Sequence, residues 1–253
     1  MAPAAARFGD VAATYERARP TYPAEVLAVL ADRAGVGPGA RVLDLAAGTG
    51  KLTRQLVALG ADVVAVEPSA GMREACAAAV PGVPVLDGTA EAIPAGDGTL
   101  DVVTVAQAFH WFRTGPALDE ISRVLRPGGW LAAVRHGPPT TAWARELWER
   151  RHRLAGFDGA AAYPGRGWPA VLAADPRFAP AETTTVVVRR ETTVAEELEE
   201  AESRSFVHTL EPDRLREVLA DLAAFLAAHP ATAGRPRLAY ERPCTLDLCR
   251  RRS

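Results

Sequence analysis

Residues 41–53 read R-V-L-D-L-A-A-G-T-G-K-L-T, and this stretch decides the fold. A short apolar strand runs through Asp44, and Gly48 and Gly50 then form a tight turn that opens a helix. Glycine lets a backbone approach a ligand closely where a Cβ would collide. The free N–H groups at a helix start attract an anionic group. The stretch therefore predicts a ligand site at the carboxyl edge of a doubly wound sheet.

Two known phosphate-binding motifs fit this turn only in part. The dinucleotide fingerprint G-x-G-x-x-G matches at Gly48 and Gly50, but Thr53 replaces its third glycine. The P-loop pattern needs a glycine where Leu45 stands and a Ser or Thr where Leu52 stands. What remains is D-x-x-x-G-x-G, which can also be an ordinary strand–turn–helix of an α/β protein.

The second apolar run narrows the choice of ligand. It ends at Glu67, 17 residues after Gly50. A carboxylate at the tip of the second strand can accept hydrogen bonds from both ribose hydroxyls of a nucleoside. The alternative is an acid that caps the next helix, a role for which Ser69 is better suited. Together the turn and the acid indicate an adenosine-containing ligand.

The rest of the chain alternates short apolar runs with helical patterns, which is typical of βαβ units. We expect strands at 41–45, 62–66, 83–86, 100–106, 130–134, 184–190 and 237–248. We expect helices at 51–59, 69–79 and 117–125, one opened by a capping box at Thr193 and Glu196, and one over 215–226. The prediction is a single α/β domain over 1–253, with an N-terminal helical cap (7–35), a cofactor-binding core (36–136) and a cover with the last strands (137–253).

Composition excludes several classes of protein. The chain has 253 residues, a net charge of −2, and 48% hydrophobic and 24% charged residues, as an ordinary globular protein does. The near-neutral charge disfavours a nucleic-acid partner. Cys76, Cys244 and Cys249 match neither a disulfide framework nor a metal site. There is no apolar run of about 18 residues and no apolar signal-sequence core, so we expect no membrane contact and a cytoplasmic location.

Five motifs in order resemble those of the class I S-adenosylmethionine-dependent methyltransferases. They are VLDLAAGTG at 42–50, VVAVEPSAGM at 63–72, GTAEAIP at 88–94, DVVTVAQAFHWF at 101–112 and VLRPGG at 124–129. FGDVAATYERARPTYP at 8–23 is similar to the preface of the type 11 small-molecule branch, which includes trans-aconitate methyltransferase-like enzymes. The resemblance covers about residues 7–136. It implies a Rossmann-like sheet, mostly parallel with one antiparallel strand, under a helical and irregular cover.

The resemblance also implies a role for each matching residue toward S-adenosylmethionine. The methionine end lies at Asp44, Ala46, Gly48 and Gly50, and the ribose at Glu67. The adenine lies between Pro68 and Met72, with Thr89, Ala90 and Glu91 at its edge. Ala106 and Gln107 lie beside the sulfonium, and Tyr15 and Arg19 close over the site.

Two positions depart from the family pattern. The family usually has glycine at the position of Ala46, and a methyl group is tolerated there if φ stays negative. The family often has aspartate at the position of Thr89, so a hydroxyl or a backbone carbonyl must accept from the adenine amino group instead. Asp87 could also substitute if its side chain points toward the adenine.

Methyl transfer from a sulfonium is an in-line displacement, so proximity and orientation supply much of the rate. A hydroxyl acceptor also needs a base, whereas a carboxylate needs none. His110 is the candidate base because it follows the fourth strand beside the cofactor residues. The alternative is that it anchors the loop or packs against the cofactor. His136 and His208 are weaker candidates.

The cover leaves two further questions open. Its aromatic residues either line an apolar acceptor pocket or form a small core of their own. They are Trp143, Trp148, Tyr163, Trp168 and Phe206. The arginines at 145, 150, 151 and 153 could attract a carboxylated acceptor, but a solvated helix face is favoured for them, as it is for the acidic run Glu196–Glu202.

The function these features favour is methyl transfer from S-adenosylmethionine to a small molecule, giving S-adenosylhomocysteine. Oxygen or carboxylate acceptors rank ahead of nitrogen or carbon. One alternative is a nucleic-acid or protein methyltransferase, although the strand-four loop reads Ala106-Gln-Ala-Phe109 and not Asn/Asp-Pro-Pro-aromatic. A second is a cofactor-binding module without chemistry. A third is an NAD-dependent oxidoreductase, which Thr53 disfavours.

Overall fold

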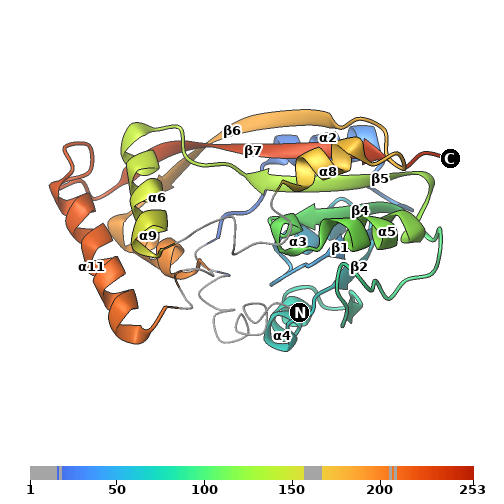
Figure 1. Ribbon diagram of the computed structural model, residues 1–253, viewed down its shortest axis with the longest axis horizontal. Coiled ribbons are helices and arrows are strands. Elements are labelled where there is room, and N and C mark those ends of the chain that lie inside the picture. The colour runs from blue at the N-terminus through green and yellow to red at the C-terminus, as the bar shows by residue number, and fades with distance from the viewer. Residues whose placement is uncertain (1–15, 17–18, 157–166, 205–206, 208–209) are drawn as a thin grey trace.

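A computed structural model describes residues 16, 19–156, 167–204, 207 and 210–253 (Figure 1). Within these residues, seven strands form one sheet in the order β3-β2-β1-β4-β5-β7-β6. Their bounds are β1 Arg41–Leu45, β2 Asp62–Val66, β3 Val85–Leu86, β4 Leu100–Ala106, β5 Leu125–His136, β6 Glu182–Thr192 and β7 Leu238–Arg250. β1 to β5 pair in parallel, and β7 runs antiparallel to both β5 and β6. The predicted fold is confirmed, including its one antiparallel strand.

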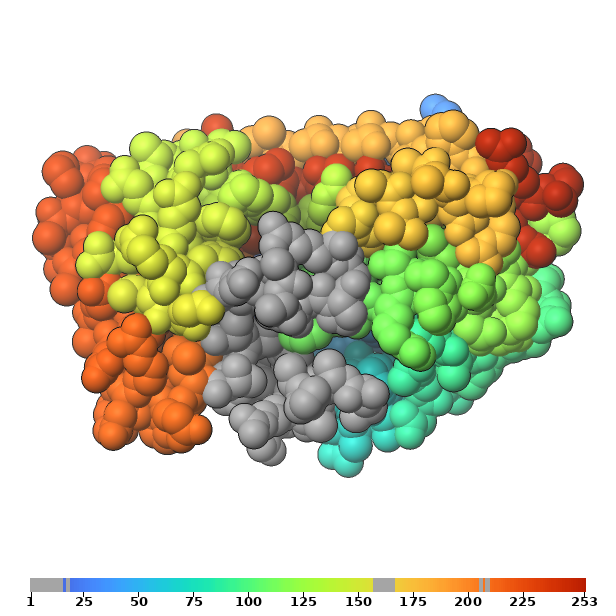
Figure 2. Space-filling view, viewed as in Figure 1, coloured from blue at the N-terminus to red at the C-terminus, as the bar shows by residue number. Residues whose placement is uncertain are grey.

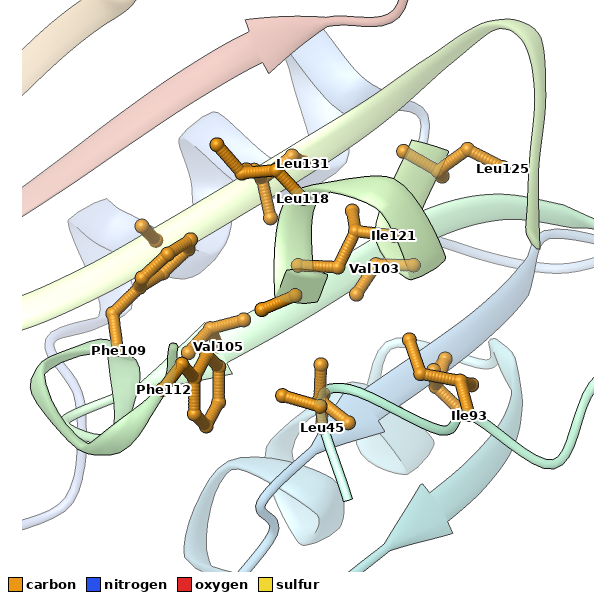
Figure 3. Close-up of a cluster of buried hydrophobic side chains, with 14 of the residues drawn as sticks. Leu45, Ile93, Val103, Val105, Phe109, Phe112, Leu118, Ile121, Leu125 and Leu131 are labelled. Atoms are coloured by element: carbon orange, nitrogen blue, oxygen red, sulfur yellow. The ribbon is translucent and has the colours of Figure 1, made fainter. Parts of the chain in front are cut away.

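Helices cover both faces of this sheet because alternate side chains of each strand point to opposite faces. Val42 of β1 packs with helices α2 (Ala24–Ala34) and α3 (Lys51–Ala58), whereas its neighbour Leu43 packs with α5 (Thr114–Val124). The α5 side holds the larger cluster, in which Phe109 and Phe112 point toward strand and helix side chains (Figure 3). The turn that begins after β4 is therefore anchored in the core. Helix α4 (Ala70–Ala79) follows β2.

The cover gathers beyond the tips of β4 and β5, at one end of the molecule (Figures 1 and 2). It contains α6 (Ala142–Leu154), α9 (Val194–Glu202) and α11 (Pro212–Ala228), while α8 (Trp168–Ala174) lies against α5. The three cover helices share an apolar core with the first residues of β7. This core includes Trp143 of α6, Leu222 of α11 and Tyr240 of β7. The cover thus has its own apolar interior and is joined to the sheet by β7.

The question about the cover's aromatic residues is answered by packing. Trp143 makes an edge contact with Tyr240 at 5.5 Å, and Trp148 lies 3.9 Å from His152. Trp168 stacks on Phe109 at 4.5 Å. Trp143 and Trp168 thus join different elements, Trp148 packs within α6, and none of the three lines the pocket described below. The other two aromatic candidates, Tyr163 and Phe206, lie outside the described residues.

The solvated-face interpretation is wrong for part of the charged cover. Arg151, Glu197 and Glu200 are 4%, 5% and 2% exposed, so they are buried between the cover helices. Arg145 and Arg153 are exposed as predicted, and Arg150 pairs with Asp221 of α11. The capping box is confirmed: the Thr193 hydroxyl accepts from the Glu196 N–H at 3.2 Å, and the Glu196 carboxylate accepts from the Thr193 N–H at 2.7 Å.

Candidate functional site

One pocket opens at the carboxyl edge of β1 and β4, between the sheet and the cover. Its lining residues are Arg19, Pro20, Tyr22, Asp44, Ala46, Ala47, Gly48, Thr49, Lys51, Leu52, Ala106, Gln107, His136, Arg204 and Arg242. The open space between them, with the mouth included, is about 540 Å³. Six predicted site residues thus come together in one cavity: Arg19, Asp44, Ala46, Gly48, Ala106 and Gln107.

Asp44 lies at the floor of this pocket and is 1% exposed. The Thr53 hydroxyl donates to its Oδ2 at 2.6 Å, and the Thr104 hydroxyl donates to its Oδ1 at 3.0 Å. Burial raises the pKa of Asp44 to about 6 in spite of these bonds. A carboxylate held in this way is strongly stabilised by a cation placed beside it.

Backbone strain is concentrated at the same place. Ala46 has φ of 57° and Gln107 has φ of 56°, and they are the two non-glycine residues with positive φ in the described ranges. The condition under which a methyl group would be tolerated at Ala46, a negative φ, is therefore not met. The Ala47 N–H donates to the Val66 carbonyl at 3.1 Å, which fixes the chain just after this residue. Both strained residues line the pocket, as is common at binding sites.

Glycine suits the two positions of the turn for different structural reasons. Gly50 has φ of 80°, and a Cβ there would meet the Cys76 sulfur at 2.9 Å, so α3 starts in close contact with α4. Gly48 also has positive φ, but a Cβ there would meet nothing within 4 Å. Gly48 thus faces open pocket space, as a residue beside a ligand should.

Glu67 lies at the end of β2 and joins this turn to the next helix. Its carboxylate accepts from the Gly48 N–H at 3.0 Å and from the Ser69 N–H at 2.9 Å. It is 7% exposed, and burial raises its pKa. The helix-start role assigned to the Ser69 side chain is wrong, because that side chain makes no capping bond and Glu67 bonds the backbone there instead. Glu67 is connected to the pocket through Gly48 without lining it.

The predicted adenine residues lie outside the pocket lining, around the tips of β2 and β3. Met72 and Ala90 are buried, at 3% and 4% exposed. Thr89 forms a bridge with Ala92, and the Glu91 carboxylate accepts from the Arg113 N–H at 2.8 Å. Pro68 follows Glu67, and its carbonyl accepts from Arg73 at 2.8 Å.

The role of Asp87 as a substitute for the family aspartate stays a prediction. Its carboxylate is exposed and pairs at 3.0 Å with Arg73, whose guanidinium also donates to the Pro68 carbonyl.

His110 lies on a 3-10 turn, Phe109–Trp111. Phe109 before it and Phe112 after it are fixed in the core (Figure 3). It is not among the pocket-lining residues. Burial and the nearby guanidiniums of Arg19 and Arg204 lower the pKa of His110 to about 4. Its imidazole is therefore neutral at pH 7, and its role as a base stays a prediction.

His136, the weaker candidate, does line the pocket. Its ring is stacked on that of Tyr22, with centroids 5.6 Å apart. Burial and the charges of Arg242, Arg204 and Arg19 lower the pKa of His136 to about 3. Two other predicted residues, Tyr15 and His208, lie outside the described ranges.

The N-terminal segment is attached to the glycine turn by Glu16. The Glu16 carboxylate accepts from the Thr49 hydroxyl at 2.5 Å and pairs with Arg54, and its carbonyl accepts from the Lys51 ammonium at 2.5 Å. Lys51 is also a pocket residue that sequence reasoning missed, as are Tyr22, Arg204 and Arg242. No motif marks the last two, which come from the cover.

Residues 43–133 match the family model described as a methyltransferase domain. An uncharacterized methyltransferase of Mycobacterium tuberculosis is 47% identical over 60% of this chain and 60% of its own length. A demethylmenaquinone methyltransferase of the same species is 43% identical over 42% of this chain and 45% of its own length. The chain thus spans less than two thirds of the curated relatives it matches.

Solved structures agree in fold. The YcgJ protein of Bacillus subtilis has a TM-score of 0.58 at 21% identity, over 90% of this chain and 99% of that one. The phosphoethanolamine N-methyltransferase 2 of Haemonchus contortus, solved with S-adenosyl-L-methionine, has a TM-score of 0.57 at 17% identity, over 97% of this chain and 57% of that one. The domain match and the named relatives support the predicted enzyme class, an S-adenosylmethionine-dependent methyltransferase, and with it the predicted cofactor.

Proposed function

We propose that this protein transfers the methyl group of S-adenosylmethionine to an oxygen of a small molecule. The observation that carries the proposal is the pocket in which Asp44, Gly48 and Gln107 meet at the carboxyl edge of the sheet. Ligands bind at this edge in doubly wound folds. The methyltransferase-domain match over 43–133 includes all three residues.

The chain's groups fit the proposed cofactor. The ionised Asp44 carboxylate suits the ammonium of the methionine end, beside the space open at Gly48. The Glu67 carboxylate, which now accepts two backbone N–H groups, suits the ribose hydroxyls. Arg19 lines the pocket and suits the methionine carboxylate, and the buried Met72 and Ala90 suit an adenine ring. When bound, the cofactor supplies an already activated methyl group.

The protein's part in the reaction is then mainly to position the acceptor and exclude water. Ala106 and Gln107 lie at the tip of β4, where the acceptor would meet the methyl group. If the acceptor is a hydroxyl, a neutral His110 or His136 can take its proton; a carboxylate needs no base. The low pKa of each histidine makes it a weak base. This favours a carboxylate or another acceptor that is already ionised.

A small-molecule acceptor is supported by the names of similar proteins, which act on demethylmenaquinone and on phosphoethanolamine. The trans-aconitate methyltransferase-like branch stays a proposal based on residues 8–23. Among the helices that the structure describes, none has the length and apolar character of a membrane span. The cytoplasmic location stays a prediction.

Calorimetric titration with S-adenosylmethionine, S-adenosylhomocysteine and NAD tests the proposal. We expect micromolar binding of the two sulfur nucleosides and none of NAD. An acceptor screen with small acids and phenols would follow, with S-adenosylhomocysteine as the measured product. Binding of neither sulfur nucleoside would contradict the proposal. Binding without turnover on any acceptor would favour the cofactor-binding module.

A further inference from the structure

The pocket has a second wall that the methyltransferase-domain match does not include. This wall is formed by His136 at the end of β5, Arg204 after α9 and Arg242 of β7. It lies on the cover side, whereas the Asp44–Leu52 turn belongs to the sheet. The ligand that we propose for this wall rests on the proposed function above.

A single buried carboxylate organises the positive charge of this wall. Glu200 pairs with Arg151 at 2.9 Å, with Arg204, and with Arg242 at 3.8 Å. Burial alone would raise the pKa of Glu200, but the surrounding guanidiniums outweigh it and hold the pKa well below its usual range. One ionised carboxylate is thus shared by three guanidiniums.

Glu197 is the other buried carboxyl group of this cluster, and Arg190 lies 4.0 Å from it. Burial together with the charge of Glu200 raises the pKa of Glu197. His136 is neutral at pH 7. Guanidiniums outnumber carboxyl groups around His136, and the charges of Arg242, Arg204 and Arg19 add to burial in lowering the pKa of this pocket histidine.

Arg242 is held in a fixed orientation. Its Nε–H donates to the Gly137 carbonyl at 2.7 Å, directly after His136. Both ring nitrogens of His136 are buried and have no hydrogen-bond partner among the described groups. Buried polar atoms of this kind are normally paired, so an unpaired pair in a pocket wall indicates a ligand. A guanidinium fixed beside a neutral imidazole is suited to a carboxylate.

We propose that Arg242 and Arg204 bind a carboxylate of the methyl acceptor, with His136 as a hydrogen-bond partner of the same molecule. The acceptor is then a small acid with at least two oxygen-bearing groups. One carboxylate is held on the cover wall, and another oxygen faces the methyl group. That oxygen forms the new O–CH3 bond while the C–S bond breaks, and the bonding electrons go to sulfur. When this oxygen belongs to a second carboxylate, no proton is moved.

The methionine carboxylate of the cofactor is another possible partner for these arginines. The cofactor has one carboxylate, and Arg19 also lines the pocket, where its guanidinium donates to the Ser203 carbonyl at 3.2 Å. Arg204 and Arg242 come instead from the part of the chain that follows the methyltransferase-domain match. The experiment must therefore separate cofactor binding from acid binding.

Calorimetry on the full-length protein, with and without saturating S-adenosylhomocysteine, makes that separation. The probes are succinate, glutarate, citrate and benzoate, with succinamide, glutaramide and benzamide as neutral controls. We expect at least one acid to bind ten times more tightly than its amide. Arg242→Gln and Arg204→Gln should each weaken that acid at least tenfold and change S-adenosylhomocysteine affinity less than threefold. The control Arg150→Gln, a cover arginine outside the pocket, should change neither.

Three results would overturn the proposal. The wild-type protein could show no preference for any acid over its amide, a result that needs no variant. Folded Arg242→Gln, or Arg242→Met if the glutamine variant does not fold, could bind the acid like wild type. The arginine variants could lose S-adenosylhomocysteine in parallel with the acid, which would assign them to the cofactor. Failure of wild type to bind S-adenosylhomocysteine would instead contradict the proposed function, because the acid arm is also measured without it.

Discussion

Replacing Asp44 by asparagine should stabilise the ligand-free protein and weaken its cofactor binding. Asp44 has a pKa of about 6 in the folded protein, against 3.8 for the ordinary group. Each pKa unit corresponds to about 1.4 kcal/mol. Between these two values the folded protein keeps a proton that the unfolded chain has lost, so stability falls as the pH rises through this window. At pH 7.5 the buried charge therefore costs about 3 kcal/mol.

Asparagine can remove this cost and keep the local hydrogen bonds. The Thr53 hydroxyl can still donate to the amide oxygen. The Thr104 hydroxyl can turn its hydrogen to the Leu43 carbonyl, 3.3 Å away, and accept from the amide nitrogen. The gain should be at most about 3 kcal/mol at pH 7.5, or about 6–12 °C in Tm for a domain of this size. It should shrink to about 0.5 kcal/mol at pH 4, because this pH is close to the pKa of 3.8 of the unfolded group and about 40% of that group is then protonated.

Differential scanning calorimetry between pH 4 and 7.5 measures this effect, with S-adenosylhomocysteine titration beside it. The variant should bind that ligand at least tenfold more weakly, because the ammonium of the ligand loses its negatively charged partner. Asp62→Asn, at the exposed start of β2, is the control and should change neither quantity. A variant that is less stable than wild type by the same amount at every pH would refute the reasoning, because burial of charge would then not be the dominant effect at Asp44.

Three further predictions follow from other residues of the site and the cover. Glu67→Ala should weaken S-adenosylhomocysteine binding about tenfold or more in calorimetry while His110→Ala leaves it nearly unchanged; equal losses would place His110 in the cofactor site. Ala46→Gly should raise the free energy of unfolding by about 0.5–1 kcal/mol in urea titration, since relief of a left-handed alanine outweighs the entropy of glycine; a decrease would show that the alanine methyl group is needed for packing. Thr193→Ala should lower the free energy of unfolding by about 1 kcal/mol through loss of the capping box, whereas an unchanged value would mean that the helix start is held by packing alone.

Apolar runs bounded by turn residues made much of the sheet predictable. The bounds of β1, β2 and β4 are those expected from the sequence. β5 begins at Leu125 and not at 130, because Leu125 pairs with Leu100 of β4 and the glycine pair Gly128–Gly129 bonds to the backbone of Arg251 at the far end of the chain. A glycine pair reads as a turn in the sequence, and only its distant partner makes it part of a strand.

The site likewise has one wall that could be predicted from the sequence and one that could not. The wall built from the Asp44–Gly50 turn was readable, because its residues are close in sequence and their chemistry is tied to one motif. The wall with Arg204 and Arg242 was not, because it depends on how the cover packs against segments more than a hundred residues away. The sign of φ at Ala46 also depends on a tertiary bond, that of the next residue to β2.

Strand β7 has a consequence for how such an enzyme can change its substrate. Its residues 244–250 pair with β5 of the cofactor sheet, while Tyr240 belongs to the core of the cover. At about 3.3 Å per residue, this one strand extends for about 43 Å, so it belongs to both the sheet and the cover. The cover helices α6, α9 and α11 pack against the first residues of this strand. Other helices could replace them, and β7 would still hold the new acceptor wall at the same position relative to an unchanged cofactor site.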